Sequence, residues 1–168
     1  YLRGNGVYAV MKDRQENLWI GSYTGGVSIA IRLRYPISTL LHEKGNRNSL
    51  ANNNVNDILQ MESGVVWYAT DSGISICNSK TNSWQHIING TVAITLSHLG
   101  NEVWVGTYGD GVYIIDGEGN IKRHLTKEQN TLYTNYIFSI VNDMQGDIWL
   151  GGLDGALMRL EKGSMKMH

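Results

Sequence analysis

Residues 103–116 read VWVGTYGDGVYIID, and this stretch decides the fold that the sequence predicts. A tryptophan between two valines is followed by a Gly-rich segment and then by a second run of β-branched and aromatic residues. This order is typical of two strands joined by a tight hairpin. Three further tryptophans begin near copies, which read WIGSYTGGV from Trp19, WYATDSGI from Trp67 and WLGGLDGA from Trp149. The chain therefore contains an internal repeat.

The spacing of these copies indicates the kind of repeat. The tryptophans are separated by 48, 37 and 45 residues, a period that is typical of blades with four strands each. Twelve positions before each tryptophan an aliphatic residue begins the expected first strand, at Val7, Val55, Val92 and Ile137. Four antiparallel strands repeated radially predict an all-β fold of β-propeller blades. We expect the tryptophan of each second strand to cover its own sheet and to reach the next one.

The repeat also predicts the domain organisation. We expect a single β-propeller fragment over residues 1–168, with about four four-stranded antiparallel blades at residues 1–46, 47–86, 87–129 and 130–168. The expected fourth strands are ISTLLHE, SWQHII, IKRHLT and, as a weaker match, SMKMH. A linker phrase with leucine and asparagine precedes three of the first strands. Residue 1 falls inside this phrase, so we expect the chain to be a piece of a longer protein.

Composition excludes several classes of function. Fourteen basic and fifteen acidic residues without clusters argue against nucleic-acid binding. No apolar run approaches the roughly 18 residues that span a bilayer, and no signal sequence is recognised. The single cysteine gives no disulfide framework, and the five histidines include no pair at metal-ligand spacing. Motifs of hydrolases, nucleotide-binding loops and metalloproteases are missing. We therefore expect no catalytic residue, cofactor or metal in this fragment.

Polar and aromatic turn residues form the candidate binding site. In a propeller, the loops from second to third strand and from fourth to first strand lie at one rim around the channel. Aromatic faces beside amides and carboxylates suit sugars, which combine apolar ring faces with hydroxyls. Tight turns use the same polar residues, so a structural interpretation stays open, as it does for the turn aspartates Asp13 and Asp143. The candidate ligand-binding residues are Tyr23, Thr24, Asp71, Tyr108, Asp110, Asp154, Asn53 and Asn135.

The repeat resembles a known family. The segments NGVYAVMKDRQENLWIGSYTGGV from Asn5 and NYIFSIVNDMQGDIWLGGLDGA from Asn135, with the linker phrase NRNSLANNNV, resemble the two-component regulator propeller repeat. The second repeat departs most, with Ala69 where the family usually has glycine. The resemblance implies the periplasmic sensor region of a hybrid two-component system histidine kinase/response regulator of gut Bacteroides-type bacteria. The parent protein is then expected to be a membrane-anchored histidine kinase that senses a carbohydrate-derived ligand such as an oligosaccharide.

Other functions and assemblies stay open. A protein-interaction scaffold is the alternative to the sensor, and a propeller lyase is the third hypothesis. Four blades leave two sheet faces that neighbouring blades normally cover. A closed four-bladed ring, a pair of arcs from two copies and an open arc are all possible, and we favour self-association as a dimer.

Overall fold

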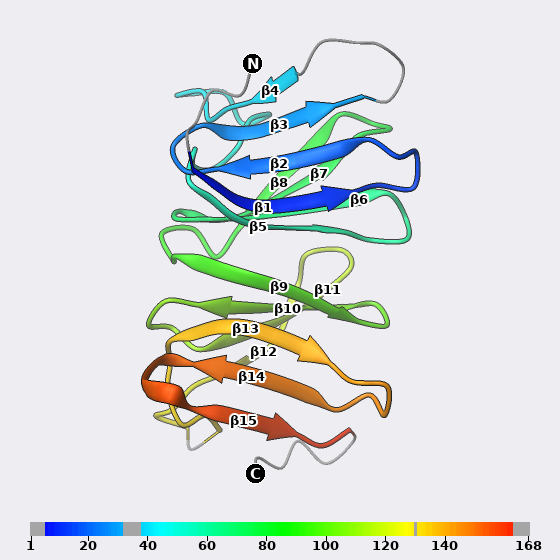
Figure 1. Ribbon diagram of the computed structural model, residues 1–168. Coiled ribbons are helices and arrows are strands. Elements are labelled where there is room, and N and C mark those ends of the chain that lie inside the picture. Colours follow the sequence, from blue (N-terminus) through cyan, green and yellow to red (C-terminus); the bar gives the residue numbers. More distant parts are fainter. Residues whose placement is uncertain (1–5, 32–37, 130, 163–168) are drawn as a thin grey trace. The chain divides into compact units, whose positions relative to one another are not determined.

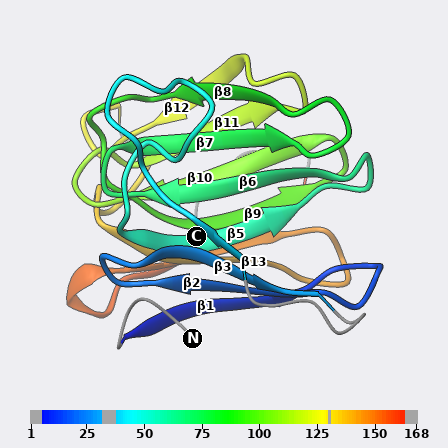
Figure 2. The same cartoon turned by 90° about the horizontal axis from the view of Figure 1, so that it is seen from above.

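The computed structural model describes residues 6–31, 38–129 and 131–162, which form four antiparallel sheets and no α-helix (Figure 1). The all-β fold of propeller blades predicted from the repeat is confirmed. The strands of each sheet run side by side in chain order, as Figures 1 and 2 show. The chain divides into two compact units, Tyr1–Gly90 and Thr91–His168. Each unit holds two sheets and is described separately.

Unit 1 contains the first two sheets. The strands of the first sheet are β1 (Val7–Lys12), β2 (Leu18–Ser22), β3 (Gly26–Ala30) and β4 (Ser38–Leu40). The strands of the second sheet are β5 (Val55–Gln60), β6 (Val65–Thr70), β7 (Gly73–Asn78) and β8 (Ser83–Ile87). The core between these sheets contains Trp19 of β2 and Tyr68 of β6, whose ring centroids are 6.3 Å apart.

Unit 2 contains the other two sheets. The strands of the third sheet are β9 (Ala93–Leu99), β10 (Glu102–Thr107), β11 (Val112–Asp116) and β12 (Ile121–Leu125). The fourth sheet has β13 (Ile137–Asn142), β14 (Ile148–Gly152) and β15 (Leu157–Leu160), with the 3-10 turn η1 (Leu153–Gly155) between the last two. The core between the sheets includes Trp104, Ile140 and Leu150. The strand expected at SMKMH lies outside the described residues.

Strand register corrects the alignment of the third repeat. The tryptophans of the first, second and fourth sheets pair with the residue eight positions earlier, as Trp19 does with Met11. Trp104 instead pairs with Ser97, seven positions earlier. The turn between β9 and β10 is therefore one residue shorter, and the first-strand residue equivalent to Val7 is Ala93. The expectation of Val92 at this place was wrong because spacing alone does not reveal a shortened turn.

An aspartate after the first strand binds the tryptophan side chain in two of the sheets. Asp13 accepts a hydrogen bond from the backbone N–H of Asn17 at 2.8 Å, which agrees with a turn-capping role. Its second carboxylate oxygen accepts one from the indole Nε1–H of Trp19 at 2.9 Å. Asp143 accepts the same bond from Trp149 at 2.8 Å. These two carboxylates thus tie the first turn to the second strand.

The other two sheets lack this bond. By register, Met61 and Leu99 stand where the first and fourth sheets have aspartate. The indole nitrogens of Trp67 and Trp104 are buried, and neither has a hydrogen-bond partner among the described residues. Packing alone therefore holds these two rings in the described part of the chain.

Replacing Asp13 with alanine is expected to lower the free energy of unfolding by about 1–3 kcal/mol, because the substitution leaves the indole N–H of Trp19 unpaired. Urea denaturation followed by tryptophan fluorescence measures this change. Arg14→Ala, in the same turn but exposed, is the control and is expected to change little. Equal effects of the two substitutions would contradict the role assigned to Asp13.

Stability is expected to fall in acid and to stay constant near neutral pH. Four aspartates in or beside turns have a pKa below the ordinary value of 3.8: Asp13, Asp116, Asp143 and Asp147. For Asp143 the main cause is the bond from Trp149, and for Asp116 it is the backbone N–H of Asn120. Burial alone would raise the pKa of Asp13, but hydrogen bonds from Trp19 and Asn17 outweigh it.

A carboxylate with a lowered pKa binds fewer protons in the folded state than in the unfolded state. Its stabilising contribution is therefore complete above the ordinary pKa and is lost as the pH falls toward the folded-state pKa. We expect the urea midpoint to be level above about pH 5 and to decrease progressively below it. A midpoint that stays level into strong acid would contradict this expectation.

Candidate functional site

The turns between second and third strands lie beside the chain that leads into a first strand. In every sheet, the residue four positions after the tryptophan of the second strand donates its backbone N–H. The acceptor is the backbone oxygen of the residue just before the first strand of the same sheet. The pairs are Tyr23 with Gly6 at 2.9 Å, Asp71 with Asn54 at 3.3 Å, Tyr108 with Val92 at 2.9 Å and Leu153 with Tyr136 at 3.0 Å. These turns and the loops that precede the first strands therefore meet at the same end of the strands in each sheet. We call this end, with its turns and loops, the rim.

The rim of the first sheet carries a pair of exposed tyrosines. Tyr23 is 50% exposed and Tyr8, on β1, is 58% exposed. Their ring centroids are 5.6 Å apart, with the planes tilted by 41°. The next residue, Thr24, has a positive φ of 56° and donates its backbone N–H to Asn54 Oδ1 at 2.9 Å. Thr24 thus joins the turn of the first sheet to the loop that leads into the second.

A polar network continues along the rim of unit 1. Asp71 accepts hydrogen bonds from the side-chain amides of Asn54, at 2.6 Å, and Asn56, at 2.9 Å. Asn54 therefore contacts the turns of both sheets, since its Oδ1 accepts from Thr24. Through Asn54 the structure thus links Thr24 and Asp71, which were predicted to lie at the same rim. Asn54 and Asn56 complete the network, and Asn56, on β5, was not among the predicted residues.

The rim of unit 2 is aromatic. Tyr108 is 54% exposed, and its ring lies edge-on to Tyr136 at 4.9 Å and to Phe138 at 6.2 Å. Tyr108 follows β10, whereas Tyr136 lies just before β13 and Phe138 lies on it, so two sheets contribute to this cluster. Tyr108 occupies the same place in its repeat as Tyr23. The two predicted tyrosines therefore form equivalent aromatic positions on the two units.

Asp110 contacts side chains of the third sheet. Tyr113 donates its hydroxyl to Asp110 Oδ2 at 2.6 Å. The Tyr113 ring stacks on His124 at 3.9 Å, and His124 Nε2 lies 2.6 Å from the Asp110 carbonyl oxygen. Burial, together with the bond to Asp110, raises the pKa of Tyr113 to about 12. The phenol thus stays protonated near neutral pH and acts as a donor.

The two predicted asparagines hold the linkers. The backbone oxygens of Asn53 and Asn135 accept from Gly26 and Gly111, each in the turn of the preceding sheet. Their Oδ1 atoms accept from the backbone N–H of the linker residues 42 and 127, at 2.6 and 2.8 Å. A role for either residue in ligand binding stays a prediction. Asp154 lies in η1 with a positive φ of 62°.

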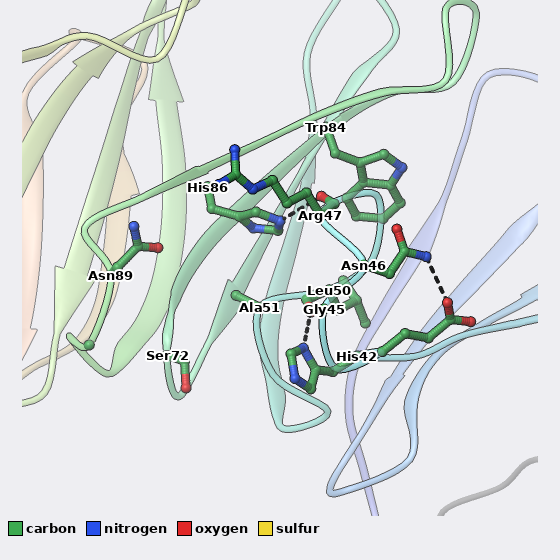
Figure 3. Close-up of a pocket in the computed structure, with 12 residues that line it drawn as sticks. His42, Gly45, Asn46, Arg47, Leu50, Ala51, Ser72, Trp84, His86 and Asn89 are labelled. Atoms are coloured by element: carbon green, nitrogen blue, oxygen red, sulfur yellow. Dashed lines mark hydrogen bonds between the residues drawn. The ribbon is translucent and has the colours of Figure 1, made fainter.

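A pocket of about 870 Å³ opens in unit 1, and none of the predicted ligand-binding residues lines it (Figure 3). We call it the linker pocket, because residues 42–51 of the linker between β4 and β5 form much of its wall. The lining includes His42, Arg47, Ser72, Trp84, His86 and Asn89. Sequence reasoning missed this pocket, which needs β8 and the linker to be brought together. The length of the linker is the feature that could have pointed to it.

The described residues contain neither a cluster that could hold a metal ion nor a helix that could cross a membrane. Between residues 6 and 162, with its two gaps, no group of three or more His, Cys, Asp or Glu side chains is placed to hold a metal ion. None of the helical turns within those ranges has the length and apolar character to cross a membrane.

Comparison with known families agrees with the repeat. The family model described as the two component regulator propeller matches residues 1–24 and 134–154. These two segments are therefore similar to the two-component regulator propeller repeat. No curated protein matches the chain.

Solved structures share the fold. The extracellular domain of BT4673 from B. thetaiotaomicron, described as a hybrid two component system, gives a TM-score of 0.82 at 15% identity, covering 98% of this chain and 25% of that chain. The extracellular domain of BT3049 from the same organism is also described as a hybrid two component system. It gives a TM-score of 0.81 at 19% identity, covering 98% of this chain and 24% of that chain. The structure of YCF48 bound to D1 peptide gives a TM-score of 0.64 at 14% identity, covering 99% of this chain and 53% of that chain. This chain thus spans about a quarter of the two extracellular domains.

Proposed function

We propose that this chain is part of the periplasmic sensor region of a hybrid two-component signalling protein, and that its rim binds a carbohydrate-derived ligand. The family match and the fold of the two extracellular domains support the sensor class. The parent protein is then an inner-membrane histidine kinase, and this fragment supplies binding without catalysis.

The rim tyrosines are the observation that carries the proposal. Tyr23 and Tyr108 are half exposed at equivalent positions, and polar groups of the Asn54–Asp71 network lie on the same rim in unit 1. Exposed rings stack on the apolar faces of sugars, while amides and carboxylates bond to hydroxyls. Signalling further requires that the ligand bind one arrangement of the protein more tightly than another.

A reporter assay in the full parent protein tests this function. Transcriptional output is measured across a panel of oligosaccharides, and at least one is expected to change it. The double variant Tyr23→Ala/Tyr108→Ala is expected to raise the half-maximal concentration of that sugar roughly tenfold or more. The control is Met144→Ala, because Met144 is 98% exposed in the turn between β13 and β14, at the opposite end of the strand from the rim. No response to the panel, or equal responses of both variants, would refute the proposal.

A protein-interaction scaffold is the second candidate, and the outer face of the fourth sheet favours it. Val141 and Leu157 are exposed on this face, and Arg159 lies over the ring of Trp149 at 5.6 Å. A further blade, a partner protein or a second copy of the chain would cover such an apolar face. Val141→Ser/Leu157→Ser would then lower the maximal signalling output, or the mass of the assembly in light scattering, without changing the half-maximal sugar concentration. Unchanged output and mass would remove this candidate.

A further inference from the structure

The linker of unit 1 is longer than the connection between sheets requires. In unit 2, residues 126–136 suffice to join β12 to β13, whereas residues 41–54 join β4 to β5. The three additional residues belong to a loop that lines the linker pocket. Loop residues beyond those needed for a connection are a common location of binding sites.

This loop is held in place by its own hydrogen bonds. The backbone N–H of Asn46 donates to Glu43 O at 3.0 Å, and the buried Ser49 hydroxyl donates to Asn46 O at 2.8 Å. Asn48 N–H donates to Asn46 Oδ1 at 2.9 Å. Because these bonds order the loop in the absence of a ligand, binding would cost little conformational entropy.

One histidine, His86 of β8, fastens the loop to the second sheet, and another, His42, forms a hydrogen bond within the loop. His86 Nε2 lies 3.0 Å from Arg47 O, so it carries the proton, and Nδ1 then accepts from the Ser75 hydroxyl at 3.2 Å. Both nitrogens of His86 are therefore occupied. His42 Nδ1 lies 2.6 Å from Leu50 O and must donate, which leaves Nε2 of His42 available to a ligand in the pocket.

The remaining groups favour an anion with a ring. Arg47 is exposed, forms no ion pair with any residue in the described ranges and lines the pocket. The only carboxylate of the lining, Glu43, accepts from Asn46 Nδ2 at 2.7 Å. Trp84 presents an aromatic ring, held by stacking on the buried Tyr68 with centroids 6.1 Å apart. The volume lies within the range of about 300–1,000 Å³ that is typical of small-molecule sites.

We propose that the linker pocket is a second binding site for a small cyclic carboxylate, distinct from the tyrosine positions of the rim. The ring of the ligand stacks on Trp84, its carboxylate binds the Arg47 guanidinium, and His42 Nε2 with Asn89 bonds to the remaining polar groups. Arginine suits this role because its planar fork matches a carboxylate with two parallel hydrogen bonds. A divalent cation does not fit, since the lining offers one carboxylate that is already hydrogen-bonded.

Calorimetric titration of the full chain tests the proposal. Glucuronate and benzoate are the probes, and glucose is the uncharged counterpart of the first. We expect at least one of the two carboxylates to bind at millimolar concentration and glucose to bind at least roughly tenfold more weakly. Whether glucuronate or benzoate binds identifies the ligand as an acidic sugar or an aromatic acid.

Two variants and a matched control locate the binding. Arg47→Gln is expected to weaken binding of the carboxylate roughly tenfold or more. Lys44→Gln removes a charge from the same loop without changing the lining and is expected to have little effect. The rim variant Tyr23→Ala/Tyr108→Ala is also expected to bind the carboxylate normally, which separates this site from the proposed sensor site. Circular dichroism verifies folding of each variant. Equal losses in the two loop variants, or no binding of either carboxylate, would overturn the proposal.

Discussion

Gly111→Ala is expected to lower the free energy of unfolding of unit 2 by more than about 4 kcal/mol. Gly111 has a positive φ of 71°, which costs an alanine about 1–2 kcal/mol. An added Cβ would also overlap the carbonyl oxygen of Leu125 and lie 3.3 Å from Leu132 Cδ1. The N–H of Gly111 bonds to Asn135, so the turn cannot move away without losing the link to the next sheet.

The control variant Gly155→Ala separates the cost of the positive φ from the cost of the overlap with Leu125. Gly155 belongs to the same unit and has a nearly equal φ of 75°, but an added Cβ meets nothing within 4 Å. We expect this control to lose only about 1–2 kcal/mol, the cost of the backbone conformation. Urea denaturation followed by circular dichroism measures both variants. Similar losses in the two would show that contact with Leu125 does not restrict position 111.

Trp104→Ala is expected to lower the free energy of unfolding by about 3–5 kcal/mol. The ring is 2% exposed and packs in the core between the third and fourth sheets. Its removal deletes apolar contacts from both sheets and leaves a cavity. Because its indole nitrogen has no partner among the described residues, Trp104→Phe loses no hydrogen bond there and is expected to cost distinctly less.

Denaturation of both variants, followed by circular dichroism, checks this comparison. Tyr133→Ala serves as the control for removing an aromatic side chain from unit 2, since Tyr133 is 77% exposed. An alanine variant at position 104 that is as stable as the phenylalanine variant would show that the ring does not join the two sheets.

The blade architecture could be predicted because it depends on local patterns. Each Trp–Gly–turn phrase contains the alternation of a strand and the glycines of a hairpin, and four copies reinforce one another. Gly111 is one of these hairpin glycines in the third repeat. Its positive φ and its close approach to Leu125 explain why glycine is needed at this position. The first strand of the third repeat was expected to begin at Val92, one residue before Ala93. This error arose because the turn between β9 and β10 is shorter without a visible change in composition.

Side-chain partners were harder to predict than strands. The bond between Asp13 and Trp19 joins residues whose sequence patterns indicate a turn and a packing ring separately. The rim positions of Tyr23 and Tyr108 followed from propeller topology, whereas their ring contacts with Tyr8 and Tyr136 required coordinates. The linker pocket depends on the approach of β8 to a loop about forty residues earlier, which no local pattern encodes.

The most direct test of the proposed sensor class is the sequence of the parent reading frame on both sides of the chain. We predict further tryptophan repeats, then one apolar stretch of about 20 residues that spans the membrane, followed by a histidine kinase domain. A reading frame with no membrane-spanning segment and no kinase domain would contradict the assignment to a two-component sensor and would favour the scaffold.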